Sequence, residues 1–350
     1  MATALPVVLL DDELFDKHVA PSAHPERPER LHAARQAMAA FDVDPLRVID
    51  ATAEELGLVH TCTYLDELDH LADRRGFLDA DTFHSEHSVA AARRAAGASV
   101  QLVRHLRCNR EAKLGVALVR PPGHHALPDR AMGFCLLNNA AVSAAVALTE
   151  GANRIAILDI DVHHGNGTEQ IFYSDPRVLY VSLHEWPQYP GTGRASDVGE
   201  GRGLGFNLNV PLTQGAGDEV YATAFEELVV PVLRQFDADA WIISAGFDAH
   251  RLDPLGGMEL GRAGYFEMGR TLASAAPPET PIAVLLEGGY DLQGIQEGLE
   301  ALLGGLGAPL AHGASGGPRA KKPSSTPLLG EAHRQDLERA KAQARRFWKV

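Results

Sequence analysis

The chain of 350 residues has few cysteines and no long apolar run. Its cysteines, Cys62, Cys108 and Cys135, are odd in number, far apart and in no C-x-x-C pair. This argues against a disulfide framework, and we expect a reducing compartment, the cytoplasm. No apolar run approaches the ~20 residues that a membrane span needs. The N-terminal run MATALPVVLL lacks a basic start and breaks at Asp11 and Asp12, so it is a poor signal peptide and is expected to form a first strand.

Positive charge is also scarce, because 32 lysines and arginines face 46 aspartates and glutamates, for a net charge of −14. An acidic chain disfavours non-specific binding to nucleic acid and to anionic membranes, and we expect neither as a partner. The charge is uneven, since residues 315–350 hold nine lysines and arginines but three aspartates and glutamates. An acidic body with a basic tail suits a cationic substrate, although net charge alone identifies none.

What the chain does have is a regular alternation of apolar runs and helical stretches. Short runs rich in Val, Ile and Leu predict strands at 6–10, 46–49, 114–119, 155–161, 178–183, 206–212, 241–245 and 282–287. Apolar spacing of about 3.6 residues predicts helices at 29–41, 85–107, 138–150, 217–236, 262–275 and 294–304. The pattern predicts one α/β domain over 1–312, with a mainly parallel eight-stranded sheet and helices on both faces.

The C-terminal part of the chain differs from this body. Residues 313–327 are rich in Gly, Pro and Ser and predict a flexible, exposed connection. Within the remaining residues, 328–350, we expect a basic helix over 331–348. Its apolar face is formed by Leu337, Ala340, Ala344 and Phe347. We expect this helix to pack on its own domain; a contact with a partner or a second copy is the alternative, and the oligomeric state stays open.

Unusual polar and glycine-rich sequences follow five of the predicted strands. In an open parallel sheet, ligands bind at the carboxyl ends of the strands. The stretches found there are RPPGHHA at 120–126, DVHHGNG at 161–167, HEWPQYPGTG at 184–193, GFDAHRLDPLGG at 246–257 and EGGYD at 287–291. Because all five meet at one edge, the sequence predicts a functional site there.

A metal site is the first chemistry that these residues suggest. Asp161 and His163 have the i, i+2 spacing that places two side chains on one side of an extended chain. They can hold one metal ion together, with Asp159 one step deeper and Asp248 as a third ligand. Two carboxylates and one imidazole leave a position open, as in catalytic metal sites, and permit Zn²⁺, Fe²⁺, Co²⁺ or Mn²⁺. Taken singly, such residues can instead cap loops or helices.

Acid–base groups accompany the predicted metal site. His124 and His125 follow a rigid Pro-Pro-Gly turn, and beside a metal ion one imidazole can act as general base and then as general acid. Asp159 can orient an imidazole, and Tyr290, after two glycines, can donate a hydrogen bond to a developing oxyanion. In isolation the histidines can be merely solvated and the tyrosine a packing residue. Together these groups indicate a mononuclear metal centre that hydrolyses an amide-like bond.

Six longer motifs occur along the chain: PPGHHA (121–126), GFCLLNNAAVSA (133–144), ILDIDVHHGNGT (157–168), YPGTG (189–193), SAGFDAHRLDPLGG (244–257) and EGGYD (287–291). They resemble the zinc-dependent histone deacetylase family, and most of all its class II and bacterial deacetylase-like amidohydrolase branch. The resemblance extends in the correct order from about His24 to residue 305. It implies the arginase-like α/β fold with an eight-stranded parallel sheet.

The resemblance also implies a mechanism. One Zn²⁺ per chain would be bound by Asp161, His163 and Asp248. His125 would be the general base and acid, His124 against the buried Asp159 would tune the electrostatics, and Tyr290 would polarise the acyl carbonyl. The implied substrate is an acylated lysine in a protein or peptide, or a small acetylated amine.

A narrow tunnel for the acyl-lysine stem is implied as well, with Phe134 and Tyr189 on its walls. Asp81 matches the rim aspartate that binds the substrate backbone, although Asp79 is close enough to leave the register open. Leu255 would lie at the rim, where polyamine-selective relatives carry a glutamate. Two glycines, Gly133 and Gly288, are further expected substrate contacts.

Sites for K⁺ or Na⁺ are a further implication of the resemblance. The first would be formed by Asp159, Asp161, His163, Ser182 and Leu183. The second would use mainly backbone carbonyls near Phe172, Asp175, Val178 and Phe206. Such ions would have a structural role.

Two positions depart from the commoner family pattern. Asn166 stands where class I enzymes have aspartate, as in class II enzymes, so His125 would have an amide behind it instead of a carboxylate. Tyr189 replaces the phenylalanine common at the tunnel wall, and its hydroxyl would alter the tunnel mouth.

Three other functions compete with hydrolysis of acyl-lysine. An acetylpolyamine or other small-molecule deacetylase would use the same chemistry. An arginase-like enzyme with two Mn²⁺ ions would need carboxylates at positions that hold Gly165 and Gly246. A non-catalytic scaffold would be expected to have lost a metal ligand, the histidine pair or Tyr290, and all of these are present.

Overall fold

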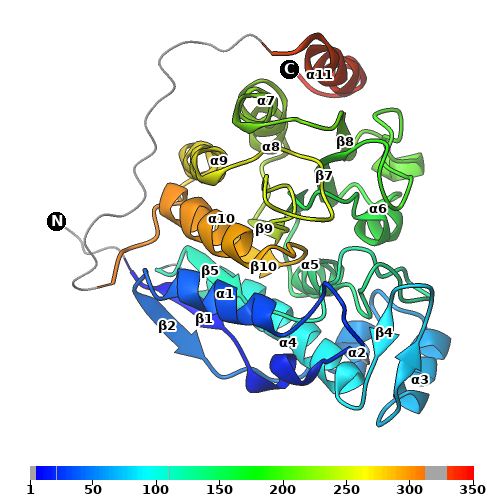
Figure 1. Ribbon diagram of the computed structural model, residues 1–350. Helices are drawn as coiled ribbons and strands as arrows, with labels where there is room; N and C mark the ends of the chain where they lie inside the picture. The colour runs from blue at the N-terminus through cyan, green and yellow to red at the C-terminus, as the bar shows by residue number, and fades with distance from the viewer. Residues whose placement is uncertain (1–4, 21, 110, 312–328) are drawn as a thin grey trace.

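The computed structural model describes residues 5–20, 22–109, 111–311 and 329–350, and an eight-stranded sheet forms its centre (Figure 1). The strands are β1 (Val7–Leu10), β2 (Val43–Leu46), β5 (Leu114–Ala117), β6 (Ile155–Asp159), β7 (Val178–Glu185), β8 (Asn207–Leu212), β9 (Ala240–Ala245) and β10 (Ile282–Leu286). Their order is β2-β1-β5-β10-β9-β6-β7-β8, and each neighbouring pair is parallel. The predicted α/β class and parallel sheet are confirmed.

Helices cover both faces of the sheet (Figure 1). One face carries α1 (Glu29–Met38), α7 (Asp218–Ala224), a π-helical turn (Phe225–Val229), α8 (Val230–Phe236), α9 (Arg262–Ala275) and α10 (Leu292–Gly305). The other carries α4 (Ser88–Cys108), α5 (Asn139–Thr149) and α6 (Asn166–Phe172). The chain begins near one edge of the sheet with β1 and β2, reaches the other edge at β8 and returns to fill the middle with β9 and β10. No helix among the described residues is both long and apolar enough to cross a membrane.

The sheet forms because its central strands are apolar on both sides. Every residue of β6, β7, β9 and β10 is buried. The helices that follow two of the functional loops begin at side chains that cap them. Asn138 accepts from the amide of Ala141 at the start of α5, and Asp291 accepts from the amide of Gly294 at the start of α10. Each cap therefore marks the point at which a polar loop ends and the following helix begins.

One predicted strand is misplaced. The run at 46–49 is apolar, but the chain pairs three residues earlier, from Val7 opposite Val43 to Leu10 opposite Leu46. Ile49 is instead 52% exposed, and its amide donates to the side chain of Gln101. An edge strand buries one side only, so its apolar pattern is weak.

Several short elements escaped prediction. They are a 3₁₀ turn (Glu13–Lys17), α2 (Ala53–Leu56), α3 (Cys62–His70), α6, and a hairpin of β3 (Gly76–Phe77) and β4 (Phe83–His84). Most are too short to show a period, whereas the helix Cys62–His70 has an apolar face of Tyr64, Leu65 and Leu68 that the sequence interpretation overlooked.

The C-terminal helix α11 (Glu331–Ala344) packs against the edge strand β8 (Figure 1). Leu337, Ala340 and Ala344 are buried there. The carboxylate of Asp336 accepts from the amide of Thr213 at 2.7 Å, just after β8. The connection predicted at 313–327 lies outside the described residues.

Candidate metal centre and active site

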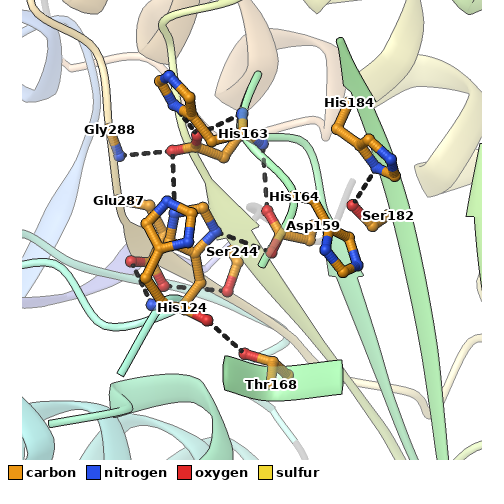
Figure 2. A network of polar contacts seen from close by, with 12 residues as sticks. His124, Asp159, His163, His164, Thr168, Ser182, His184, Ser244, Glu287 and Gly288 are labelled. Atoms are coloured by element: carbon orange, nitrogen blue, oxygen red, sulfur yellow. Dashed lines mark hydrogen bonds and ion pairs between the residues drawn. The ribbon is translucent and has the colours of Figure 1, made fainter. Parts of the chain in front are cut away.

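The loops after β5, β6, β9 and β10 meet at the carboxyl edge of the sheet and form one polar network (Figure 2). The loop after β7 reaches the same place, because the ring of Tyr189 lies 5.2 Å from that of His125 and 6.2 Å from that of His163. The five stretches singled out in the sequence are therefore neighbours in space.

Asp161, His163 and Asp248 are the compact group at the centre of this network. Their possible ligand atoms all lie within 4.8 Å of one another. His163 Nδ1 is 3.1 Å from Asp161 Oδ1 and 3.2 Å from Asp248 Oδ2, and both carboxylates are fully buried. The backbone orients the carboxylates, since the Gly288 amide donates to Asp161 Oδ2 and the Val162 amide to Asp248 Oδ1, each at 2.8 Å.

Negative charge is in excess in this group, because two buried carboxylates share one imidazole. Burial and the neighbouring Asp161 raise the pKa of Asp248 to about 7. Burial opposes protonation of His163, but its hydrogen bonds to Asp161 and Asp248 outweigh that effect and raise its pKa to about 10. A divalent metal ion fits the same three donors, with His163 neutral and both carboxylates ionised.

His124 and His125 lie beside the metal group, with ring centroids 4.0 Å apart and the ring planes tilted by 43°. Nδ1 of His124 is 3.0 Å from Asp159 Oδ2, which also accepts from the hydroxyl of Tyr180. Burial disfavours protonation of His124, but the charges of Asp161 and Asp159 outweigh it and raise its pKa. His124 is therefore held as a cation.

His125 has the opposite character. Burial, together with the nearby His124 and His163, lowers its pKa well below the usual range, so the imidazole is neutral. Its Nδ1 lies 2.8 Å from Asn166 Oδ1, an atom that can only accept. Nδ1 therefore carries the proton, and Nε2 keeps a free lone pair. This is the state that a general base requires.

Tyr290 is buried beyond the metal group, on the loop after β10. Gly289 before it has φ +114°, a left-handed conformation that favours glycine. The ring packs between the Arg30 guanidinium, 5.0 Å from its centroid, and the ring of Phe134 at 5.7 Å. Burial raises the pKa of the phenol well above its usual range, so the hydroxyl keeps its proton and can donate a hydrogen bond.

The predicted tunnel residues surround these groups. Tyr189 lies against the two histidines His125 and His163, whereas Phe134 lies against Tyr290. Phe134 has φ +68°, and its amide donates to the Thr82 hydroxyl at 3.1 Å. Gly133 is needed for close approach, since a Cβ there would lie 2.5 Å from the His125 ring.

The rim residues lie on the loops next to these walls. Asp79 is used within its own turn, where Oδ1 accepts from the amides of Asp81 and Thr82. The backbone carbonyl of Asp81 is hydrogen-bonded to the ring of His24, and that ring also contacts Phe134. Asp81 itself is half-buried. The Asp81 carboxylate accepts one long hydrogen bond, from the Thr82 hydroxyl at 3.4 Å, whereas that of Asp79 accepts two backbone amides. Leu255 is half-buried, and its carbonyl accepts from the side chain of Gln188, next to Tyr189.

Gly288 lies against the two carboxylates of the metal group, and its expected contact with the substrate stays a prediction. Its amide donates to Asp161, and a Cβ there would lie 2.2 Å from Asp248 Oδ2. It belongs to the wall of the metal group.

The predicted cation sites stay predictions. Ser182 is opposite Asp159 in the pairing of β6 with β7, and its hydroxyl lies 2.9 Å from His184 Nδ1. Among the second set, the carbonyls of Phe172, Asp175 and Phe206 each accept a backbone hydrogen bond.

Two important features escaped the sequence interpretation. Glu26, Arg30 and Arg120 form a fully buried ion network, in which Arg30 donates to the carbonyl of Gly289 at 2.5 Å and to that of Glu287. Arg30 and Gly289 are 259 positions apart, so no local pattern could reveal the contact. The second feature is Asp253, which binds the backbone of Tyr290.

A second buried group of possible metal ligands consists of His124, Cys135 and Glu287. Its atoms already have partners within the protein. Glu287 accepts from the amides of Gly123 and His124 and from the hydroxyl of Ser244, and the Cys135 thiol donates to the carbonyl of Gly133. We therefore assign no metal to it.

Comparison with known proteins agrees with this geometry. The profile of the histone deacetylase domain matches residues 24–306. Histone deacetylase 15 of Arabidopsis thaliana is 42% identical over 315 residues, which cover 86% of this chain and 56% of that protein. A protein named "Probable deacetylase" from Archaeoglobus fulgidus is 38% identical, over 81% of this chain and 80% of its own. The crystal structure of the HDA15 HD domain superposes with a TM-score of 0.89 at 38% identity, covering 98% of this chain and 97% of that one.

The parallel sheet and the site at its carboxyl edge thus define a protein of the arginase/deacetylase fold. Within that class, the chain belongs to the histone deacetylase family, as its motifs indicated. Membership makes it a deacetylase-type hydrolase. The chain spans about half the length of the plant relative, so that protein's further properties do not transfer with the domain.

Proposed function

We propose that this protein hydrolyses the acetyl amide of acetyl-lysine in proteins or peptides, with one bound Zn²⁺. The observation that supports this most is the group Asp161, His163 and Asp248, whose possible ligand atoms lie within 4.8 Å of one another, with the ring of His125 6.1 Å from that of His163. Zinc held by those three residues would act as a Lewis acid on water and on the acyl carbonyl.

The chain's own residues would then do the following. His125 accepts a proton from the attacking water at Nε2, because Nδ1 is engaged with Asn166, and later returns it to the leaving lysine amine. The protonated His124 stays charged against Asp159 and stabilises negative charge nearby. Tyr290 donates its phenolic hydrogen bond to the oxyanion that forms from the carbonyl.

Tyr189 and Phe134 flank the stem of the acylated lysine and exclude water from it, while the carboxylate of Asp81 accepts from the substrate backbone. We further propose that Ser182 and its neighbours hold a structural K⁺ or Na⁺. The free thiols of Cys62, Cys108 and Cys135 support a cytoplasmic location.

A deacetylase of acetylated polyamines is the alternative with the same chemistry. Leu255 argues against it, because an apolar rim side chain cannot attract the distal ammonium group of a polyamine.

A substrate panel with purified, zinc-loaded protein tests the proposal. We expect hydrolysis of acetyl-lysine peptides in preference to acetylspermidine, and longer acyl groups in the same panel measure which chain lengths the enzyme accepts. His125→Ala should lower kcat by roughly 10²–10⁴-fold, the usual contribution of a general acid–base group, with the metal content unchanged. Equal rates for the wild type and the alanine variant would contradict the proposed role of His125.

A further inference from the structure

Asp253 is a buried carboxylate close to the site that takes no part in the proposed chemistry. It is 7% exposed and lies on the loop after β9, five positions beyond Asp248. Its Oδ2 atom accepts from the amides of Tyr290 at 2.6 Å and Asp291 at 3.0 Å. Its Oδ1 atom accepts from the amide of Leu255 at 2.9 Å. One side chain thus ties the loop that carries Tyr290 to the loop that carries the rim.

Only a carboxylate can make all three of these bonds. The three partners are backbone N–H donors, and an ionised aspartate offers two oxygens that only accept. An asparagine of the same shape has a single acceptor oxygen, while its NH₂ group would meet an N–H donor. It can therefore keep the bonds to Tyr290 and Asp291 or the bond to Leu255, but not both sets.

Tyr290 needs such an anchor because of the residues before it. Gly288 and Gly289 have no side chains that could hold the loop by packing, and Gly289 is in a left-handed conformation. Arg30 fixes the carbonyl of Gly289 from one side, and Asp253 fixes the amide of Tyr290 from the other. The peptide unit between Gly289 and Tyr290 is thus held at both polar ends, which fixes the backbone from which the phenol projects.

We propose that Asp253 is a positioning residue that sets the Tyr290 hydroxyl relative to the substrate rim at Leu255. The proposal rests on the proposed function, because it concerns the residue that would polarise the acyl carbonyl. The side chain of Asp253 makes no hydrogen bond to Asp161, His163 or Asp248; its partners are the backbone amides of Tyr290, Asp291 and Leu255, and it acts through the backbone of Tyr290.

The test is a double-mutant cycle of Asp253→Asn and Tyr290→Phe, with kcat and KM measured on an acetyl-lysine peptide. Tyr290→Phe alone should lower kcat by about 10²–10³-fold, as for loss of an oxyanion donor. Asp253→Asn alone should lower kcat by roughly 10-fold and change KM by less than about 3-fold. In the Tyr290→Phe background it should lower kcat by less than about 2-fold, because the hydroxyl that it positions is gone.

Asp239→Asn is the matched control. Asp239 accepts from the amides of Asn153 and Arg154 with a single oxygen, as Asp253 does from Tyr290 and Asp291, but it lies just before β9 at the opposite edge of the sheet. We expect the wild-type rate from it. Zinc content and thermal midpoint, measured for every variant, show which ones are folded. Should Asp253→Asn not fold, Asp253→Glu, which keeps the charge but shifts the oxygens, enters the same cycle.

The outcomes separate the two proposals. A Tyr290→Phe variant as active as the wild type would overturn the proposed function of that residue. Suppose instead that Tyr290→Phe is impaired and that Asp253→Asn lowers kcat by the same factor in the wild type and in Tyr290→Phe. That result would overturn the positioning role of Asp253 alone. So would an Asp253→Asn variant with the wild-type kcat.

Discussion

Replacing Asn166 by aspartate tests whether His125 works as a neutral base. In the wild type, His125 Nδ1 faces a neutral amide oxygen at 2.8 Å, and burial with His124 and His163 nearby lowers its pKa. A carboxylate at that place stabilises the imidazolium, and an opposite charge at such a distance raises a pKa by about 1–3 pH units. The protonated histidine cannot accept a proton. The acidic limb, the fall of kcat/KM at low pH, should therefore move to higher pH by about 1–3 units. At a fixed pH below that fall, each pH unit of this move lowers kcat/KM about tenfold.

The assay is the pH profile of kcat/KM on an acetyl-lysine peptide. Asn166 is the first residue of α6, where an acidic side chain suits the helix dipole, so the variant is expected to fold. Asn109→Asp makes the same change of charge at the exposed end of α4 and should leave the profile in place, since solvent and salt screen a distant charge. A folded, active Asn166→Asp variant with an unshifted acidic limb would refute the assignment of His125 as the base.

Two further predictions concern the metal and the substrate. Dialysis against a chelator should abolish hydrolysis, and Zn²⁺ should restore it at about one equivalent per chain, because Asp161, His163 and Asp248 form a single group. Metal analysis that finds two tightly held ions per active chain would contradict this. Leu255→Glu should shift the ratio of kcat/KM toward acetylspermidine roughly tenfold, or ~1.4 kcal/mol, since a partly wet rim weakens a single ion pair. A wild type that already prefers the polyamine, or an unchanged ratio in the variant, would count against Leu255 as the selecting residue.

Much of the fold was predictable because its information is local. Seven of the eight predicted runs overlap the strand they predicted by all or most of its length, since buried parallel strands are continuous apolar segments. β2 was displaced because an edge strand with a proline, Pro45, has a weak apolar pattern. The hairpin at 76–84 was missed because two-residue strands have no period to detect.

The candidate site was predictable to the extent that its residues stand at strand ends. Asp161, His163 and Asp248 were expected to meet, and the structure brings them together; their role as zinc ligands stays a prediction. The contacts of Arg30 and Asp253 could not be predicted in this way. Each binds backbone groups of the loop around Tyr290 from another part of the chain. Arg30 is 257 positions from its nearer partner, Glu287, and Asp253 is 37 positions from Tyr290; a backbone partner leaves no mark in the sequence.

The packing of α11 on β8 has a consequence for synthesis on the ribosome. Thr213 and its partner Asp336 are 123 positions apart, so the amide next to β8 is made long before the carboxylate that binds it. At about 5–20 residues per second, that interval is roughly 6–25 s. During this time the edge of the sheet has no α11 to cover it, and an uncovered edge can pair with another chain. The helix that covers β8 is thus made after all eight strands of the sheet, and until it is made the nascent domain is open to self-association along this edge.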